Sequence, residues 1–194
     1  MDGNQVSGGD TIMLSEFRSR KVASGFAELD ANGDGHLERG DIETLVHSHG
    51  AAYGYEPGSP EYEDLARNTL GVWDQVRQFD SDGDGRVTLE EYVAGFGAFI
   101  DQRDAFLAGM GALVDSFYSM ADRDGDGLIS EEELILHYRA WRHTEDQARE
   151  AFTHLDRGSR GGISKQDWML NLEEFYYSDD PEAPGNWLAP LPGA

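Results

Sequence analysis

Carboxylate side chains recur at alternate positions in two short segments of this chain, and a glutamate closes each segment. In Asp80–Glu91, aspartates stand at positions 1, 3 and 5, and the glutamate stands at position 12. Asp122–Glu133 repeats the arrangement, and both segments carry a glycine at position 6. Alternate residues of such a loop point inwards, so their oxygens converge on one point. Six to eight converging oxygens suit a hard divalent cation such as calcium.

Each segment offers four carboxylates and one main-chain carbonyl as predicted ligands. The carbonyl belongs to position 7, and the glutamate at position 12 reaches back with both of its oxygens. The first segment supplies Asp80, Asp82, Asp84, Arg86 through its carbonyl, and Glu91. The second supplies Asp122, Asp124, Asp126, Leu128 through its carbonyl, and Glu133. At position 9, Thr88 and Ser130 are expected to contribute through a water molecule.

An earlier segment, residues 30–41, has the same pattern in a looser form. Its predicted ligands are Asp30, Asn32, Asp34, His36 through its carbonyl, and Asp41. Asp41 at position 12 is one methylene shorter than glutamate, so we expect fewer oxygens around the ion. Lower coordination suits magnesium, and we therefore expect calcium here with magnesium as a competitor. Glu38, at position 9, offers a carboxylate that could bind the ion directly.

A fourth segment, residues 156–167, keeps the length of the others but loses their ligands. Gly158 has no side-chain oxygen at position 3, and Arg160 places a positive charge at position 5. We therefore expect no metal ion here. Ile163 at position 8 is still apolar, like its counterparts in the other segments, Leu37, Val87 and Ile129. We expect Ile163 to pair with its counterpart and so to brace the third segment.

The stretches on either side of each segment predict amphipathic helices, because their apolar residues are three and four apart. Ser59-Pro60-Glu61 predicts a helix start, and so do Thr144–Gln147, a capping box, and Ser164. Residues 50–59 are expected to form the loop that joins the first two units. Glycines at 95, 97, 109 and 111 weaken helix, so we expect a bend near Asp101.

Helix–loop–helix units with this ligand spacing are EF-hands. With four of them, the chain resembles proteins of the sarcoplasmic calcium-binding protein and calerythrin type over roughly residues 14–191. The long connection between the first two hands and the acidic, proline-containing ending from Phe175 to Trp187 also carry the resemblance. It implies an all-α fold, with four hands in two pairs, short antiparallel β bridges between paired loops, and one compact globule. It also implies a calcium buffer or signal modulator. Members of that group usually lack a different hand, often the second, so we expect the intact partners here to be hands one and two.

We expect four parts along the chain. Residues 1–10 form a flexible N-terminus, residues 11–101 the first pair of hands and residues 102–177 the second pair. Residues 178–194 form a tail, which we expect to pack on the core through Trp187 and Leu188.

Composition agrees with cation binding, since 38 acidic residues against 15 basic ones give a net charge of −23. Such a chain repels nucleic acid and anionic membranes. There is no cysteine, and we find no signal peptide and no membrane span, so we expect a cytoplasmic monomer. No nucleophile and base stand at a recognisable spacing, so we expect no enzyme activity.

Two alternatives to a buffer remain open. A calcium sensor would expose a target-binding surface, yet the chain has only five Met against four Trp, eight Tyr and nine Phe, which favours a core that stays closed. A protein target is possible but not indicated. A carrier of a small apolar ligand is the second alternative, and core packing is the simpler interpretation of its candidate lining residues. These are Trp73, Trp141, Trp168, Tyr138 and His137.

Overall fold

A computed structural model describes residues 14–189, without the side chains of Ala112, Leu113 and Ser116. The predicted flexible N-terminus, residues 1–10, lies outside the described residues, as do residues 190–194 of the predicted tail. Within residues 14–189 the chain folds into α-helices joined by four tight loops, with two short antiparallel sheets. None of the described helices is both long and apolar enough to cross a membrane.

The first two hands pair through their loops. Their helices are α1 (Glu16–Leu29), α2 (Arg39–Tyr53), α3 (Pro60–Val76) and α4 (Leu89–Ile100), with a 3-10 turn η1 (Arg77–Phe79) before the second loop. Between the helices, β1 (His36–Leu37) runs antiparallel to β2 (Val87–Thr88), and Leu37 lies opposite Val87. Both of these side chains are fully buried, so the pairing joins the two loops through apolar contact.

The third and fourth hands repeat this arrangement. Their helices are α5 (Arg103–Ala121), α6 (Glu131–Ala140), α7 (Glu145–Leu155) and α8 (Lys165–Tyr177), followed by a 3-10 turn η2 (Pro184–Leu188). Here β3 (Leu128–Ile129) pairs antiparallel with β4 (Ile163–Ser164), and Ile129 lies opposite Ile163. The predicted fold class, with β bridges between the position-8 residues, is therefore confirmed.

Helix starts follow the predicted capping residues. Ser59 accepts a hydrogen bond from the amide of Tyr62, and Pro60 is the first residue of α3. Thr144 and Gln147 form the capping box of α7, and Ser164 caps α8. These side chains satisfy amides that have no partner within the helix, which is why the helices begin at these residues.

The predicted loop at residues 50–59 is shorter than expected, because α2 continues to Tyr53 and ends at Gly54 with φ 74°. Gly50 lies inside α2, where the ring of Tyr62 from α3 packs against it. A Cβ at this glycine would lie 2.7 Å from a Tyr62 ring carbon. Gly50 therefore allows two helices to approach closely and does not begin the loop.

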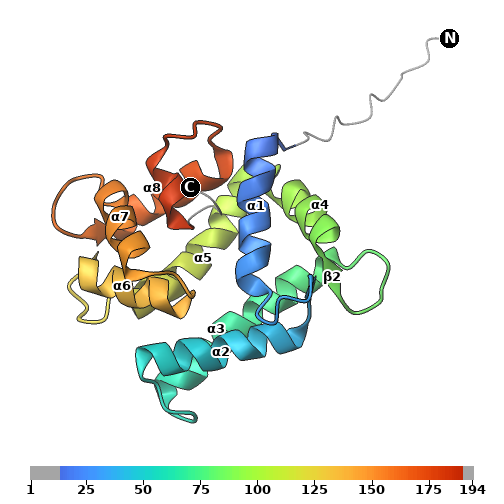
Figure 1. The fold of residues 1–194 in the computed structure, drawn as a ribbon, viewed down its shortest axis with the longest axis horizontal. Helices are drawn as coiled ribbons and strands as arrows, with labels where there is room; N and C mark the ends of the chain where they lie inside the picture. The colour runs from blue at the N-terminus through green and yellow to red at the C-terminus, as the bar shows by residue number, and fades with distance from the viewer. Residues whose placement is uncertain (1–13, 190–194) are drawn as a thin grey trace.

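Two apolar clusters, one in each pair of hands, meet at the centre of the molecule. Met110 of α5 and Tyr176 of α8 pack against both clusters, so the core is continuous. The expected bend is present, because α4 ends at Ile100 and α5 begins at Arg103. Figure 1 shows α5 crossing the middle of the globule, with the two pairs of hands on either side.

The segment after α8 folds back over the second pair of hands. Trp187 stacks on His154 of α7 with ring centroids 4.4 Å apart, and its carbonyl accepts a hydrogen bond from the hydroxyl of Tyr138. From α1, Lys21 donates to the Ser178 carbonyl at 2.7 Å and to Asn186 Oδ1 at 3.2 Å. The tail therefore links the first helix to the last one.

Candidate metal centres

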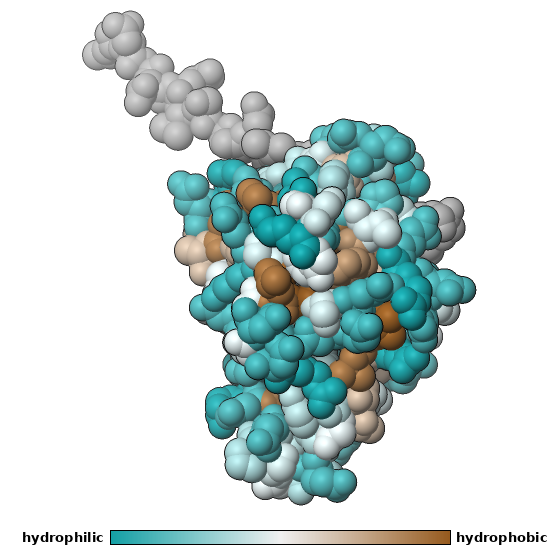
Figure 2. Space-filling view, turned by 90° about the vertical axis from the view of Figure 1, so that its left-hand side faces the viewer, coloured by the Kyte–Doolittle hydropathy of each residue, from teal (hydrophilic) through white to brown (hydrophobic). Residues whose placement is uncertain are grey.

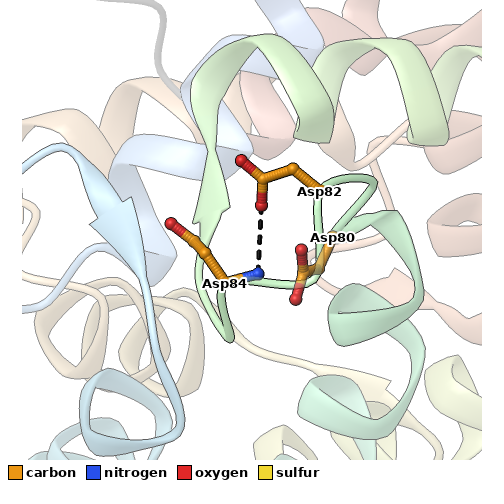
Figure 3. Close-up of side chains that lie close together, drawn as sticks. All are labelled: Asp80, Asp82 and Asp84. Atoms are coloured by element: carbon orange, nitrogen blue, oxygen red, sulfur yellow. Dashed lines mark hydrogen bonds between the residues drawn. The ribbon is translucent and has the colours of Figure 1, made fainter.

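The second loop gathers three aspartates between η1 and β2. Carboxylate oxygens of Asp80, Asp82 and Asp84 all lie within 4.8 Å of one another. Figure 3 shows the three side chains on the same short turn, with the Asp84 amide donating to Asp82 Oδ1 at 3.0 Å. Gly85 follows with φ 89°, and its amide donates to Asp80 Oδ2 at 3.0 Å. This left-handed turn favours glycine, and it bends the chain around the oxygens.

Glu91 closes the second loop from the first turn of α4. Its Oε1 accepts hydrogen bonds from the amide and hydroxyl of Ser81, and its Oε2 accepts from those of Thr88, at 2.8–3.0 Å. The Thr88 amide, followed by the Ser81 groups, lowers the pKa of Glu91 to about 2. The carboxylate is therefore held ionised at the loop. Arg86 lies directly before β2, and its amide donates to Asp84 Oδ1 at 2.8 Å.

The third loop has the same construction. Oxygens of Asp122, Asp124 and Asp126 lie within 4.8 Å of one another, between α5 and β3. The Gly127 amide donates to Asp122 Oδ2 at 3.1 Å. Leu128, the predicted carbonyl ligand, is the first residue of β3, and its amide donates to Asp126 Oδ1 at 2.8 Å.

Glu133 closes this loop, accepting from the Arg123 amide at 2.7 Å and from the Ser130 amide at 2.8 Å. Partial burial raises its pKa, but hydrogen bonds from Ser130, Arg123 and Asp124 outweigh that effect and lower the pKa overall. Asp122 Oδ1 is buried and has no hydrogen-bond partner among the described residues. A buried anionic oxygen without a partner is costly, and a cation in this loop would compensate it.

The first loop differs at positions 3 and 12, as the sequence indicates. Asp30 accepts from the amides of Gly33 and Gly35 at 2.8 and 2.9 Å, and Asn32 accepts from the amide of Asp34 at 2.8 Å. Asp41 is almost fully buried and accepts from the amides of Asn32 at 3.3 Å and Glu38 at 2.9 Å. Its shorter side chain makes one distant contact with the opposite side of the loop. His36 is the first residue of β1.

Glu38 lies between the first two loops. Its Oε1 is 2.8 Å from Nε of Arg86, which belongs to the second loop. Its main-chain carbonyl accepts from the Asp41 amide at 3.1 Å. The contact with Arg86 competes with direct coordination of an ion by the Glu38 carboxylate, which stays a prediction.

The fourth loop has an acidic residue at each end and an arginine between them. The amides of Arg160 and Gly161 donate to Asp156 at 3.1 and 2.9 Å, and the Arg160 guanidinium contacts the carboxylate of Asp167. The sequence indicated that Arg160 disfavours metal, but it gave no partner for the guanidinium. The available signal was an acid kept at position 12 of a loop whose other ligands are lost.

Comparison with known proteins supports the same conclusion as the loop geometry. Residues 21–97 match the EF-hand domain pair family, and residues 114–136 match the EF hand family. The chain is an EF-hand protein. Both matching families describe calcium-binding hands, and neither is a catalytic family.

Two curated relatives of this EF-hand protein match most of its length. Calerythrin from Saccharopolyspora erythraea is 26% identical over 168 residues, covering 85% of this chain and 95% of the relative. The probable calcium-binding protein CML25 from Arabidopsis thaliana is 29% identical over 174 residues, covering 87% and 80%. With the structural likeness below, they confirm a calcium-binding EF-hand protein of the calerythrin and sarcoplasmic calcium-binding protein type.

Solved structures share the fold of this EF-hand protein. A Streptomyces coelicolor calcium-binding protein, described in terms of calcium-mediated regulation in prokaryotes, superimposes with a TM-score of 0.69 at 26% identity, covering 82% of this chain and 97% of that one. The sarcoplasmic calcium-binding protein from amphioxus gives a TM-score of 0.71 at 17% identity, covering 92% and 100%. At that low identity, the amphioxus likeness shows the fold alone.

Proposed function

We propose that this EF-hand protein is a cytoplasmic, monomeric calcium buffer or signal modulator with three metal sites and one hand that binds no ion. The second and third loops are the calcium sites, and the first is a weaker site at which magnesium competes. The proposed ligands are those at positions 1, 3, 5, 7 and 12 of residues 80–91, 122–133 and 30–41.

One observation carries the proposal. In the second and third loops, three aspartate carboxylates lie within 4.8 Å of one another. At effective dielectric constants near 20, two like charges 4 Å apart repel by about 4 kcal/mol. Such crowding is tolerable when a divalent cation supplies the opposite charge, and flexible six- to eight-fold oxygen coordination makes calcium the fitting ion. The partnerless Asp122 Oδ1 points to the same conclusion in the third loop.

The weaker first site follows from its two substitutions. Asn32 replaces a carboxylate, and Asp41 reaches less far than the glutamates of the other loops. Both changes reduce the charge or the number of oxygens offered to an ion. Magnesium, which prefers six ligands and keeps several waters, loses less by this than calcium does.

The closed core supports a buffer. Among the large hydrophobic residues of the described segment, Leu89 on α4 and Leu170 on α8 are the exposed ones. Figure 2 shows hydrophobic side chains scattered among hydrophilic ones on the face it presents. A sensor that opens on binding calcium would instead form a broad apolar groove.

A calcium titration by calorimetry, with and without millimolar magnesium, tests the proposal. We expect three binding events, with tight binding at the second and third loops. Magnesium should selectively weaken calcium binding at the first loop. Fewer than two tight events would contradict the ligand assignment. Fluorescence of a hydrophobic dye, measured in the same titration, should change little if the protein is a buffer.

A sensor is the second candidate, because the Streptomyces coelicolor relative is described in terms of calcium-mediated regulation. A large calcium-dependent rise in dye fluorescence would favour it over the buffer.

An apolar-ligand carrier has weaker support. The coelenterazine-binding protein from Renilla muelleri shares the fold, with a TM-score of 0.68 at 21% identity. Of the five aromatic and histidine residues considered as lining, Trp141 borders a surface hollow of about 400 Å³ beside the first loop. The other four line neither this hollow nor a second one between α3 and α5, and they are buried in the core. Core packing therefore accounts for them.

A further inference from the structure

The fourth loop keeps the backbone arrangement of a metal-binding loop. Gly161 at position 6 has φ 80°, close to the 86° of Gly127 in the third loop. Its amide donates to Asp156 Oδ2 at 2.9 Å, as the Gly127 amide does to Asp122 Oδ2 at 3.1 Å. At the other end, Ser164 and Asp167 form the same capping box that Ser130 and Glu133 form. The loop has lost its ligands without losing its shape.

A guanidinium group lies on the ligand side of this loop. Nη2 of Arg160 contacts the position-12 carboxylate of Asp167 and lies 3.2 Å from Ser164 Oγ. The rest of the group packs on Gly158, where a Cβ would lie 2.8 Å from both Cζ and Nη1 of the arginine. Gly158 at position 3 has no side chain, and the guanidinium from position 5 occupies the space that such a side chain would fill.

The contact between Arg160 and Asp167 balances the charge of buried carboxylates. Asp156 and Asp167, at positions 1 and 12, are 8% and 6% exposed, whereas the acids at the same positions of the second and third loops are partly exposed. Burying two carboxylates requires a compensating positive charge. Asp167 keeps a lowered pKa despite its burial, because the hydrogen bonds from Ser164 and Arg160 outweigh desolvation.

The fourth loop contacts the third loop directly, so the shape of one affects the other. β4 pairs with β3, and the Cβ of Leu128 lies against Gly162, where an added Cβ would be 2.8 Å away. The hydroxyl of Tyr118 donates to the carbonyl oxygens of Gly127 and Ile163, both at 2.9 Å. One side chain of the third hand thus joins the two loops beside position 7 of the third loop.

We propose that the guanidinium of Arg160 takes the place of the metal ion in the fourth loop, holds that loop in its binding shape at every calcium concentration, and so positions the third loop to bind calcium. Arg160 is a positioning residue that acts through β4, β3 and Tyr118. This inference rests on the proposed function, because it requires the third loop to be a calcium site. A loop ordered in advance loses less entropy on binding, which raises its affinity.

The test compares two variants that each remove one positive charge from the fourth loop. Arg160→Gln removes the proposed substitute cation, and Lys165→Gln removes an exposed charge whose partner is Asp115 on α5. Amide resonances of Gly85 and Gly127 follow calcium binding at the second and third loops separately. We expect Arg160→Gln to weaken binding at Gly127 by about fivefold to tenfold, at the lower end of typical coupling between sites. Binding at Gly85 should change less than about twofold, the deviation typical of distant, independent sites.

Two outcomes overturn the inference in distinguishable ways. If Gly127 of the unmodified protein does not respond to calcium, the proposed function fails at this site and the inference fails with it. If Gly127 responds normally, and Arg160→Gln has no more effect than Lys165→Gln, the inference alone is wrong. Arg160→Lys separates charge from shape, because it keeps the cation and should retain most of the affinity.

If Arg160→Gln does not fold, a variant whose fourth loop is changed into a calcium-binding loop tests the inference instead. The triple variant Gly158→Asp, Arg160→Asp, Asp167→Glu exchanges the substitute cation for a calcium-binding ligand set. We expect one additional bound ion, and we expect slow hydrogen exchange in β3 and β4 only when calcium is present. The unmodified protein should protect these amides without calcium. Equal protection of the calcium-free triple variant and the calcium-free unmodified protein would overturn the inference.

Discussion

The third and fourth hands share one backbone design and differ in the source of their positive charge. In the third loop, aspartates at positions 1, 3 and 5 crowd together, and an oxygen of Asp122 is buried without a partner. In the fourth, Arg160 supplies a cation from within the chain and contacts Asp167. The two proposals together imply that this loop shape depends on charge balance, which an ion or a side chain can provide. We expect the third hand to respond to calcium and the fourth to keep its shape at every calcium concentration.

The position-12 acids offer the strongest way to test this contrast. Glu133→Gln removes a charged oxygen from the third loop, and a charged hydrogen-bonding group is worth about 1.5–3 kcal/mol. We therefore expect roughly tenfold to hundredfold weaker calcium binding there, measured by calorimetry. The matched change Asp167→Asn should leave the number of bound calcium ions unchanged and lower stability without calcium. A lost calcium ion in Asp167→Asn would contradict the division between the hands.

Acid should lower the free energy of unfolding through two buried histidines, one on α2 and one on α6, which pack together. His49 of α2 is 1% exposed and packs against Trp141, with ring centroids 4.6 Å apart. Burial, followed by the charge of Arg142, lowers its pKa to about 4. On α6, His137 accepts or donates a hydrogen bond with the Tyr53 hydroxyl at 3.0 Å, and burial lowers its pKa to about 3.

Because both folded-state pKa values lie below the ordinary 6.5, the unfolded chain takes up protons first as the pH falls. The stability due to the neutral rings is present above pH 6.5 and is lost on acidification towards pH 4 and pH 3. At pH 5 the loss should be about 2 kcal/mol for each histidine. Urea unfolding between pH 7 and pH 5 measures it, and His49→Phe should remove about half of the loss. If the free energy of unfolding of His49→Phe fell with pH as steeply as that of the unmodified protein, His49 would not contribute.

The position-6 glycines offer a weaker but cleaner comparison. Gly127 and Gly161 have φ of 86° and 80°, where an alanine costs about 1–2 kcal/mol. Gly127→Ala and Gly161→Ala should therefore lower the free energy of unfolding by similar amounts. Only Gly127→Ala should abolish or weaken a calcium site directly, as calorimetry would show. Equal effects on calcium binding would mean that the two loops act as one site.

The smallest expected effect concerns the first loop. Glu38 contacts Arg86 at 2.8 Å, and both side chains are partly exposed, so this ion pair is worth about 0–1 kcal/mol. If Glu38 is no ligand, Glu38→Gln should change affinity at the first site by less than about fivefold. A larger loss, seen in the same calorimetric titration, would identify Glu38 as a direct ligand of that site.

Local patterns account for the parts of the structure that were predicted correctly. Ligand spacing, capping residues such as Ser59 and Thr144, and apolar position-8 residues act over a few neighbouring residues, so the sequence displays them. The end of α2 was predicted too early, because Gly50 serves a contact with Tyr62 twelve residues away. The burial of His49 was not predicted, because it depends on α2 meeting α6, whereas His137 is buried as the core-packing interpretation expected.

By itself, the sequence determined four helix–loop–helix units, their order, and the residues that each loop can offer to a cation. Those properties follow from backbone geometry and from side-chain chemistry within a dozen residues. Tertiary structure alone decided that Arg160 meets Asp167, that Glu38 turns to Arg86, and that Tyr118 joins the third and fourth loops. Long side chains can reach several partners, and only the packed positions of neighbouring elements select one of them.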